Sequence, residues 1–155
     1  MPAVDQSLLV FLLEQQRYAL SLPVVERVLH ALAVTPLPGA PAAVQGVVNV
    51  HGQVASVFDI RSRFGLQTRP PRLGDQLILA RAALRLVALG VDAVEGVVDF
   101  PDSAIADPTE VLLHNSAFIK GVVRLPDGLL LIHDLDAFLA PDEAQALDAA
   151  LARFE

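Results

Sequence analysis

The chain has 155 residues, a formal net charge of −7 at pH 7 and no cysteine. This length suits one domain, or two small subdomains that share a core. Its single lysine and scattered arginines do not form the basic stripe that nucleic-acid binding requires. The lack of cysteine excludes disulfide bonds and thiolate zinc sites.

The hydrophobic content of 54% does not come from membrane-spanning segments. A spanning helix needs about 18 apolar residues in succession, whereas the apolar runs here are short and end at charges or turn residues. Such runs are typical of strands buried on both faces. The first residues do not follow the pattern of a secretory signal, so we expect a cytoplasmic protein without direct membrane insertion.

Clustered aliphatic and β-branched residues predict five strands in the first half of the chain. They cover residues 8–13, 18–22, 24–34, 47–50 and 54–58. The proline-rich segment 36–41 interrupts them, because proline removes a backbone donor. His51-Gly52 joins the last two strands as the two-residue turn of a hairpin. Asp59 is expected to cap a short helix over residues 60–64.

The second half is predicted to use the same order of elements with different turn residues. Its clearest strands cover residues 76–80, 84–89, 121–125 and 129–133. Pro126-Asp127-Gly128 makes the last turn, since proline presets φ and glycine accepts a positive φ. Asp134 is again expected to cap a short helix, over residues 135–139.

Two other segments of the second half have their own predictions. Residues 99–108 contain two prolines and are predicted to form a loop. A final helix is expected to begin at Pro141, with acidic residues in its first turn. Leu147, Leu151 and Phe154 would then lie on one face of this helix and pack on the body of the protein.

Two internal matches indicate that one unit occurs twice. Residues 46–59 return as residues 121–134, with a glycine-to-aspartate spacing of 13 in both copies. Upstream, residues 18–28 match residues 87–97 at an offset of 69, whereas the later pair has an offset of 75. The second copy has therefore gained six residues. A β-rich unit used twice predicts two subdomains, with a junction near residues 66–75.

The sequence contains no motif of an enzyme or a cofactor site. It has no nucleophile elbow, dinucleotide fingerprint, phosphate loop or zinc-protease motif. His133, Asp134 and Asp136 come nearest to a ligand cluster, but alternation along a strand places the first two on opposite faces. We therefore interpret His133 as a tolerated polar residue at a strand end. We predict no enzyme activity, no catalytic residue, no cofactor and no metal.

Aliphatic residues at matching positions in the two copies are the remaining candidates for a function. They are Leu22, Val25 and Val28 in the first copy and Val91, Val94 and Val97 in the second. One inward-facing set of side chains fills a small barrel, so additional aliphatics either cover each other or meet a partner. The pattern leaves both interpretations open.

The segment Gly46-Val-Val-Asn-Val-His-Gly-Gln-Val-Ala-Ser-Val-Phe-Asp-Ile-Arg61 resembles the signature of the CheW-like domain family. That signature reads Gly-x-x-Asn-Leu-Arg-Gly-x-x-x-Pro-x-x-Asp-Leu-Arg, and the resemblance extends over essentially the whole chain. The structural positions that it marks are Gly46, Asn49, Gly52, Asp59, Arg61, Gly121 and Asp134. It implies a mainly β domain over residues 1–155, made of two interleaved five-stranded SH3-like barrels with short helices and a C-terminal helix.

The same resemblance implies a non-catalytic adaptor of a bacterial chemosensory array. Such proteins couple the cytoplasmic tip of methyl-accepting chemoreceptors to the regulatory domain of the histidine kinase CheA, and they pack against other CheW-like domains. The resemblance assigns kinase binding to Leu9, Leu22, Val25 and Val28. It assigns receptor binding to Arg27, His51 and Val97. The protein is then expected at membrane-associated receptor arrays.

The chain departs from the family pattern at His51, Arg27 and Ser56, where arginine, glutamate and proline are usual. Arginine is always charged, whereas histidine is shorter and has an unperturbed pKa of about 6.5. We therefore expect altered receptor specificity. The alternative is an adaptor of a non-flagellar system, such as type IV pilus (twitching) motility or array localisation. A small enzyme or ligand-binding barrel would need a pocket with converging polar groups.

Overall fold

The computed structural model describes residues 5–30, 34–67, 69, 70, 72, 74–82, 85–112, 118–137 and 141–153, excluding the side chains of residues 62, 141 and 142. The strands are β1 (Asp5–Leu13), β2 (Gln16–Ser21), β3 (Val25–His30), β4 (Val44–Val50), β5 (Gln53–Phe58), β6 (Gln76–Ala82), β7 (Arg85–Val91), β8 (Ala93–Pro101), β9 (Ile105–Ala106), β10 (Ile119–Leu125) and β11 (Gly128–His133). The helices are the 3-10 turns η1 (Leu22–Val24), η2 (Arg61–Phe64) and η3 (Asp102–Ala104) and the α-helices α1 (Pro108–Val111) and α2 (Pro141–Arg153).

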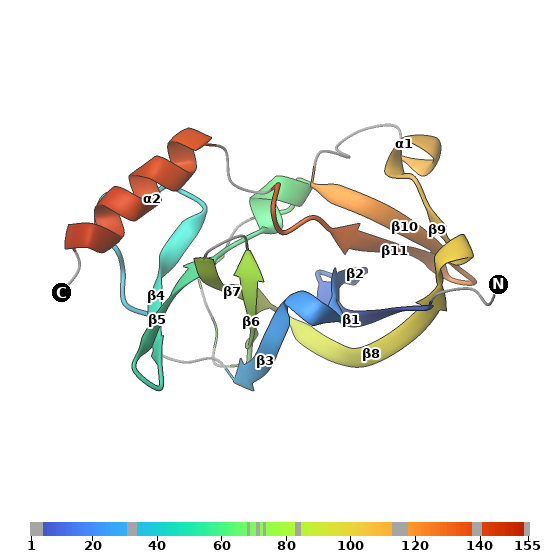
Figure 1. The fold of residues 1–155 in the computed structure, drawn as a ribbon, viewed down its shortest axis with the longest axis horizontal. Coiled ribbons are helices and arrows are strands. Elements are labelled where there is room, and N and C mark those ends of the chain that lie inside the picture. The colour runs from blue at the N-terminus through green and yellow to red at the C-terminus, as the bar shows by residue number, and fades with distance from the viewer. Residues whose placement is uncertain are drawn as a thin grey trace.

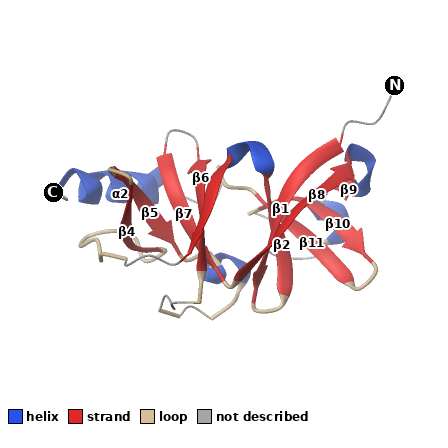
Figure 2. Ribbon diagram, turned by 90° about the horizontal axis from the view of Figure 1, so that it is seen from below, coloured by secondary structure: helices blue, strands red, loops and turns tan. Residues whose placement is uncertain are grey.

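Two sheets lie side by side along the long axis of the molecule (Figure 1 and Figure 2). The six-stranded sheet has the order β8-β1-β2-β11-β10-β9, and the five-stranded sheet has the order β3-β6-β7-β5-β4. Helix α2 lies at the far end of the five-stranded sheet, beside β4 and β5 (Figure 1). The prediction of a mainly β protein with few helices is confirmed.

Each sheet combines strands from both copies of the repeat. The opening hairpin of the first copy, β1–β2, joins β8, β10 and β11 of the second copy. The equivalent hairpin β6–β7 joins β3, β4 and β5 of the first copy. Each sheet joins the copies through one parallel and one antiparallel pair. These are β2 with β11 and β1 with β8 in the six-stranded sheet, and β7 with β5 and β3 with β6 in the five-stranded sheet. The copies therefore exchange their opening hairpins. The predicted junction near residues 66–75 falls between η2 and β6 and remains a prediction.

Neither sheet closes into a barrel. In the described part of the chain, the edges of the six-stranded sheet are β8 and β9, those of the five-stranded sheet are β3 and β4, and no two edges pair with each other. The predicted five-stranded SH3-like barrels are therefore not confirmed. The sixth strand, β9, belongs to the inserted segment and pairs two residues with β10. This two-residue strand forms the edge of the sheet beside β10 and does not pair with β8 at the other edge.

The prediction of a loop over residues 99–108 is wrong for most of that segment. Strand β8 continues to Pro101, η3 and β9 follow, and α1 begins at Pro108. A proline at the end of β8 is tolerated because β8 is an edge strand and does not need that backbone donor. The first copy retains a trace of β9, since Thr35 forms an isolated bridge with Val47.

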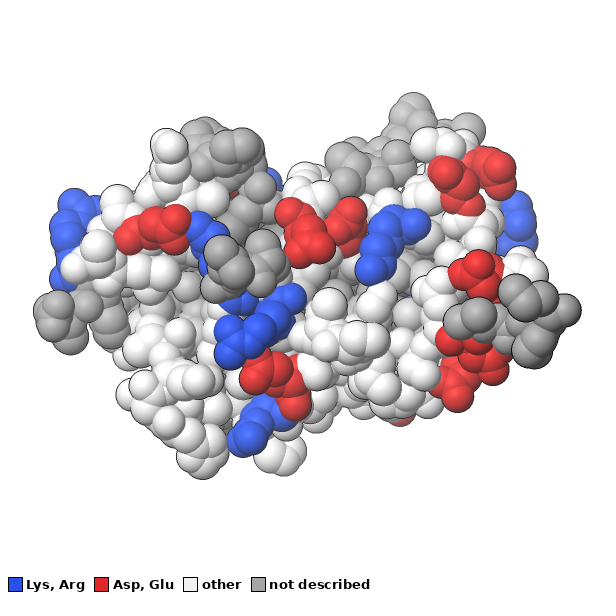
Figure 3. Space-filling view, viewed as in Figure 1, with Lys and Arg blue, Asp and Glu red and all other residues white. Residues whose placement is uncertain are grey.

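A glutamate bulges out of one edge strand in each sheet, at equivalent positions of the repeat. The pairing of β3 with β6 skips Glu26, and the pairing of β8 with β1 skips Glu95. Bulges at sheet edges change the direction of a side chain. Each carboxylate here meets an arginine at 2.8 Å, Glu26 with Arg81 and Glu95 with Arg17. On the face shown in Figure 3, acidic and basic side chains lie side by side in several places.

The buried side chains of the described residues form three hydrophobic clusters. The largest draws on both sheets and on α2, and we call it the main core; it includes Leu9, Phe58 and the fully buried Leu147. Leu151 also packs against it, which confirms the predicted helix face, while Phe154 lies outside the described residues. Two smaller clusters have members that correspond under the repeat. They include Val48, Val57, Leu77, Leu79 and Ala88 in one sheet and Val123, Ile132, Leu8, Val10 and Ala19 in the other.

Candidate partner-binding site

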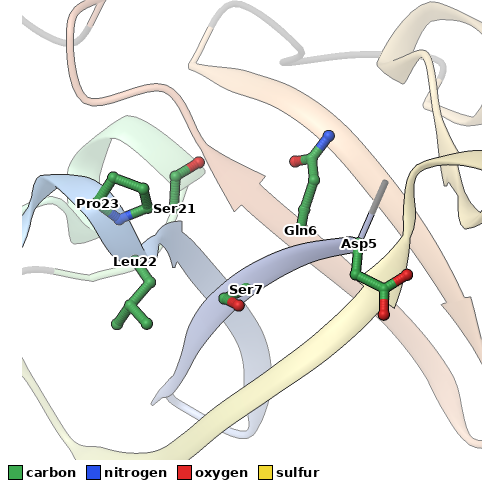
Figure 4. Close-up of a pocket in the computed structure, with 6 residues that line it drawn as sticks. All are labelled: Asp5, Gln6, Ser7, Ser21, Leu22 and Pro23. Atoms are coloured by element: carbon green, nitrogen blue, oxygen red, sulfur yellow. The ribbon is translucent and has the colours of Figure 1, made fainter. Parts of the chain in front are cut away.

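A hollow of about 520 Å³ opens where the chain leaves β2, passes through η1 and enters β3 in the other sheet. It is lined by Asp5, Gln6, Ser7, Ser21, Leu22 and Pro23. Figure 4 shows Leu22 and Pro23 at one side of the hollow and Asp5 and Gln6 at the other. We call it the junction hollow, because it lies where the chain crosses between the two sheets.

The polar side chains of the junction hollow are partly engaged within the protein. The Ser7 hydroxyl donates to Asp99 at 2.6 Å, and the Gln6 amide donates to Asp102 at 2.5 Å. These bonds connect β1 to β8 and η3 and leave Leu22 as the apolar wall of the hollow. An apolar wall with engaged polar neighbours suits the contact of a protein side chain better than the capture of a polar small ligand.

Strand register places Val97 on the same face as buried core residues near the junction hollow. Val97 on β8, Leu9 on β1 and Leu20 on β2 form one cross-strand row. Leu9 and Leu20 belong to the main core, and Leu22 packs against it. Val97 is 52% exposed, so the row runs from the interior to an open rim.

The structure separates the four predicted kinase-binding residues into two classes. Leu9 is 5% exposed and lies within the main core, so its side chain is largely covered. Leu22, Val25 and Val28 are half-buried and pack against that core from η1 and β3. These three side chains therefore support the core and also reach the surface, and their contact with a partner remains a prediction.

The three predicted receptor-binding residues are exposed and lie on different strands. Arg27 lies on β3 and His51 at the tip of the β4–β5 hairpin, at opposite edges of the five-stranded sheet. Val97 lies on β8 of the other sheet. Their role in receptor binding remains a prediction.

The tip of the β4–β5 hairpin has the predicted two-residue turn. His51 and Gly52 both have positive φ, 51° and 85°, as a type I′ turn requires. The Asn49 side-chain oxygen accepts a hydrogen bond from the Gly52 amide at 2.9 Å. The signature residues Asn49 and Gly52 thus shape the turn, and His51 is left exposed at its apex.

The signature glycine Gly46 marks a close approach of two backbone segments. Its φ is 154°, and a Cβ atom at this position would lie 2.2 Å from the Thr35 carbonyl oxygen. The equivalent Gly121 faces the inserted strand in the same way, because a Cβ there would lie 2.7 Å from Ile105. Glycine is therefore required by packing at both positions.

The signature pair Asp59 and Arg61 belongs to a buried charge cluster. The sequence motif marks these two residues and none of the other members. Asp59 accepts from the Arg61 amide at 3.0 Å, as expected of a capping residue, and it also pairs with the Arg61 guanidinium at 3.4 Å. Arg61, only 2% exposed, pairs with Asp92 as well. Arg69 contacts Asp92 and Asp75, both at 2.6 Å.

Asp92 is the residue that connects the parts of this cluster. Partial burial opposes its ionisation, but hydrogen bonds from the Glu14 amide, Arg69 and Arg61 outweigh burial and hold the pKa of Asp92 below its ordinary value. Glu14 belongs to the β1–β2 turn, Arg61 to η2 and Arg69 to the connection before β6. No local pattern marks Asp92 or Arg69, because their partners are distant in the sequence.

His133 lies at the end of β11, the strand end that was predicted for it, and its side chain belongs to the core. It is 1% exposed and meets the edge of Phe64, with ring centroids 5.4 Å apart. Burial, with a smaller contribution from Lys120, lowers the pKa of His133 to about 4. The repeat contains the explanation, because Phe58 occupies the equivalent position and is also fully buried.

The second signature aspartate is less buried than the first. Asp134 accepts from the Asp136 amide at 3.2 Å, but residues 135–137 form a turn and not the predicted helix. The rest of that predicted helix lies outside the described residues. Within the described ranges, no three histidine or acidic side chains gather into a metal site, and no helix is long and apolar enough to span a membrane.

Comparison with known proteins identifies the family to which this architecture belongs. Residues 7–143 match the CheW-like domain family. The chemotaxis protein CheW of Rhizobium meliloti (strain 1021) is 27% identical over 142 residues, covering 91% of this chain and 92% of that protein. The chemotaxis protein CheW of Bacillus subtilis (strain 168) is also 27% identical, over 144 residues and 91% of both chains.

A solved structure agrees with the fold. The crystal structure of the scaffolding protein TtCheW from Thermoanaerobacter tengcongensis superimposes with a TM-score of 0.76 at 27% identity, covering 85% of this chain and 92% of that one. The twofold repeat, the signature residues that shape the β4–β5 turn and this superposition lead to the same assignment. The chain belongs to the CheW-like domain family.

Proposed function

We propose that this chain is a non-catalytic coupling protein of a bacterial chemosensory array, which links chemoreceptors to the histidine kinase CheA. Its family membership supports this, as do relatives named chemotaxis protein CheW and a similar structure named a scaffolding protein. The observation that carries the proposal is the aliphatic surface at the junction of the two sheets. There, exposed Val97 continues a row of core residues beside the junction hollow.

The kinase regulatory domain would contact Leu22, Val25 and Val28. Their side chains are half-buried against the main core, so they are held in place before a partner arrives. Covering their remaining apolar surface would contribute roughly 25 cal/mol per Å². Leu9, which is 5% exposed, would support this surface from beneath.

The receptor would contact the face that contains Val97. A chemoreceptor tip is helical, and an amphipathic helix binds by placing an apolar stripe in a groove. Val97, at the open rim of the cross-strand row, is the apolar side chain suited to such a stripe. Arg27 and His51 would then act at the periphery, since they lie at opposite edges of the other sheet.

The test titrates the protein with a CheA regulatory domain and, separately, with a soluble receptor-tip fragment. Val97→Asp should weaken receptor binding at least tenfold and leave kinase binding unchanged. Val54→Asp is the matched control, because Val54 is 43% exposed and lies away from this face, on β5. The proposal fails if the wild-type protein binds neither partner at high micromolar concentration, or if both substitutions have the same effect.

The alternative is an adaptor of a non-flagellar system, and the observation behind it is His51 at the exposed apex of the hairpin. Affinity purification from the native cell followed by mass spectrometry separates the two. Recovery of chemoreceptors with CheA supports the first candidate. Recovery of pilus-motility components without chemoreceptors supports the second.

A further inference from the structure

Strand β8 is an open edge with exposed side chains on both of its faces. It pairs with β1 on one side, and no described strand pairs with the other. Three large hydrophobic side chains are exposed among the described residues, and two of them, Val97 and Val98, are neighbours on β8 at 52% and 44% exposure. Adjacent residues of a strand point to opposite faces of the sheet. A partner that covered one face would leave the other valine in water.

An added strand would cover both valines at once. A strand placed beside β8 positions its side chains next to those of β8 on each face, and it also satisfies the free backbone groups of the edge. The bulge at Glu95 and the proline at Pro101 confine regular geometry to residues 97–100. The edge therefore offers a short segment for pairing, which protects it against indiscriminate aggregation.

A second hollow, of about 490 Å³, lies beside this edge and reaches the β10–β11 turn. We call it the edge hollow. It is lined chiefly by Val10, Val98, Phe100, Leu125, Pro126 and Leu130. Val98 is thus an exposed member of an apolar pocket that a side chain from a strand beside β8 could enter.

The rim of the edge hollow has an excess of negative charge. Arg17 donates to Glu95 at 2.8 Å and to Asp127 at 3.0 Å, so one guanidinium is shared by two carboxylates. The bulge in β8 is what aims Glu95 at this site. The three groups are 37–67% exposed, which leaves the carboxylates accessible to a second cation.

We propose that the β8 edge binds an extended segment of a partner protein, which adds to the six-stranded sheet as a further strand. Aliphatic side chains of the segment cover Val97 and Val98, and a lysine or arginine lies against Glu95 and Asp127. A second copy of the same strand is disfavoured, because Glu95 and Asp99 of two copies would then oppose like charges. The proposal does not depend on the coupling function, whose receptor contact is helical.

The test uses the full chain and a fluorescein-labelled probe peptide, acetyl-Ser-Lys-Val-Val-Thr-Val-Ser-amide. A second probe has the same residues in reverse order, so that both strand directions are covered. Wild-type protein should bind one probe, with shifts of the amide resonances of residues 97–100. Replacing the probe lysine by glutamate, or N-methylating alternate backbone amides, should weaken binding at least tenfold.

Protein variants identify the surface that is used. Val98→Thr should weaken binding, while Val54→Thr should not. Val54 is exposed to a similar extent, 43% against 44%, but lies on β5, which is paired on both sides. Glu95→Gln with Asp127→Asn should weaken binding of the lysine probe, and Glu26→Gln, at the equivalent bulge of the other sheet, should have no effect. Each variant is first checked for an unchanged urea midpoint.

Several results would overturn the proposal. They are no binding of either probe at millimolar concentration, equal binding of the N-methylated probe, or equal losses from Val98→Thr and Val54→Thr. Self-association of the chain at this edge, detected by sedimentation with no binding of the probes, would assign the surface to a second copy instead.

Discussion

Replacing Arg61 with leucine should destabilise the protein more than any surface charge substitution. Arg61 is 2% exposed and pairs with Asp59, which is itself 5% exposed. After the replacement, the Asp59 carboxylate stays buried without its cation, although the amide of residue 61 still donates to it. Asp92 keeps its bonds from Arg69 and the Glu14 amide.

The structure sets the expected size of this effect. Removing one partner of a buried ion pair typically costs about 3–5 kcal/mol, because the other charge is left uncompensated. Since Asp92 remains bonded, we expect the lower end, about 3 kcal/mol. For a domain of this length, that loss lowers the melting temperature by about 6–12 °C.

The assay is urea unfolding followed by circular dichroism, with the free energy of unfolding extrapolated to water. Arg17→Leu is the control, because Arg17 also pairs with two carboxylates but is exposed, and its loss should be close to undetectable. Asp59→Asn in the Arg61→Leu background should recover part of the lost stability. Equal unfolding free energies for Arg61→Leu and Arg17→Leu would show that the buried pair of Asp59 and Arg61 contributes no more to stability than an exposed pair.

Three further predictions follow from buried, strained and exposed positions. Burial lowers the pKa of His133 from 6.5 to about 4. The contribution of neutral His133 to the free energy of unfolding is therefore fully present above pH 6.5 and is lost as the pH falls toward 4. His133→Phe should remove this part of the pH dependence of the urea midpoint. Gly46→Ala should destabilise the protein far more than Gly128→Ala in the same unfolding assay, because both have φ near 150° but only Gly46 would place a Cβ 2.2 Å from Thr35. His51→Arg should strengthen or broaden receptor binding in a titration with no change in melting temperature; a parallel loss of both would show that His51 is structural.

Much of the fold could be predicted because strands and turns are encoded locally. The hairpins, the turn at His51-Gly52 and the buried face of α2 follow from the periodicity of apolar residues and from turn chemistry. The equivalence of Phe58 and His133 under the repeat also contained the signal that His133 is buried. Strand alternation alone does not decide the burial of His133, because it separates His133 from Asp134 without showing which face of the sheet is covered.

The candidate site was less accessible to prediction. Exposure of Val97 and burial of Leu9 depend on their places in one cross-strand row, with Leu9 in the middle and Val97 at the edge. Both are aliphatic residues of predicted strands, and nothing local distinguishes them. The same holds for the open edge at β8, which exists only because no strand is placed beside it in the described part of the chain.

The order of residues alone shows that a β-rich unit occurs twice, where its hairpins turn and that glycine occupies equivalent sites in both copies. Three features appear only in the folded chain: the copies exchange their opening hairpins, the sheets stay open, and Asp92 pairs with both Arg61 and Arg69. The two groups of features differ in the range of the interactions behind them. Turn and strand preferences act between neighbours in the chain, whereas strand pairing and buried charge pairs join residues far apart and form only when the whole core packs.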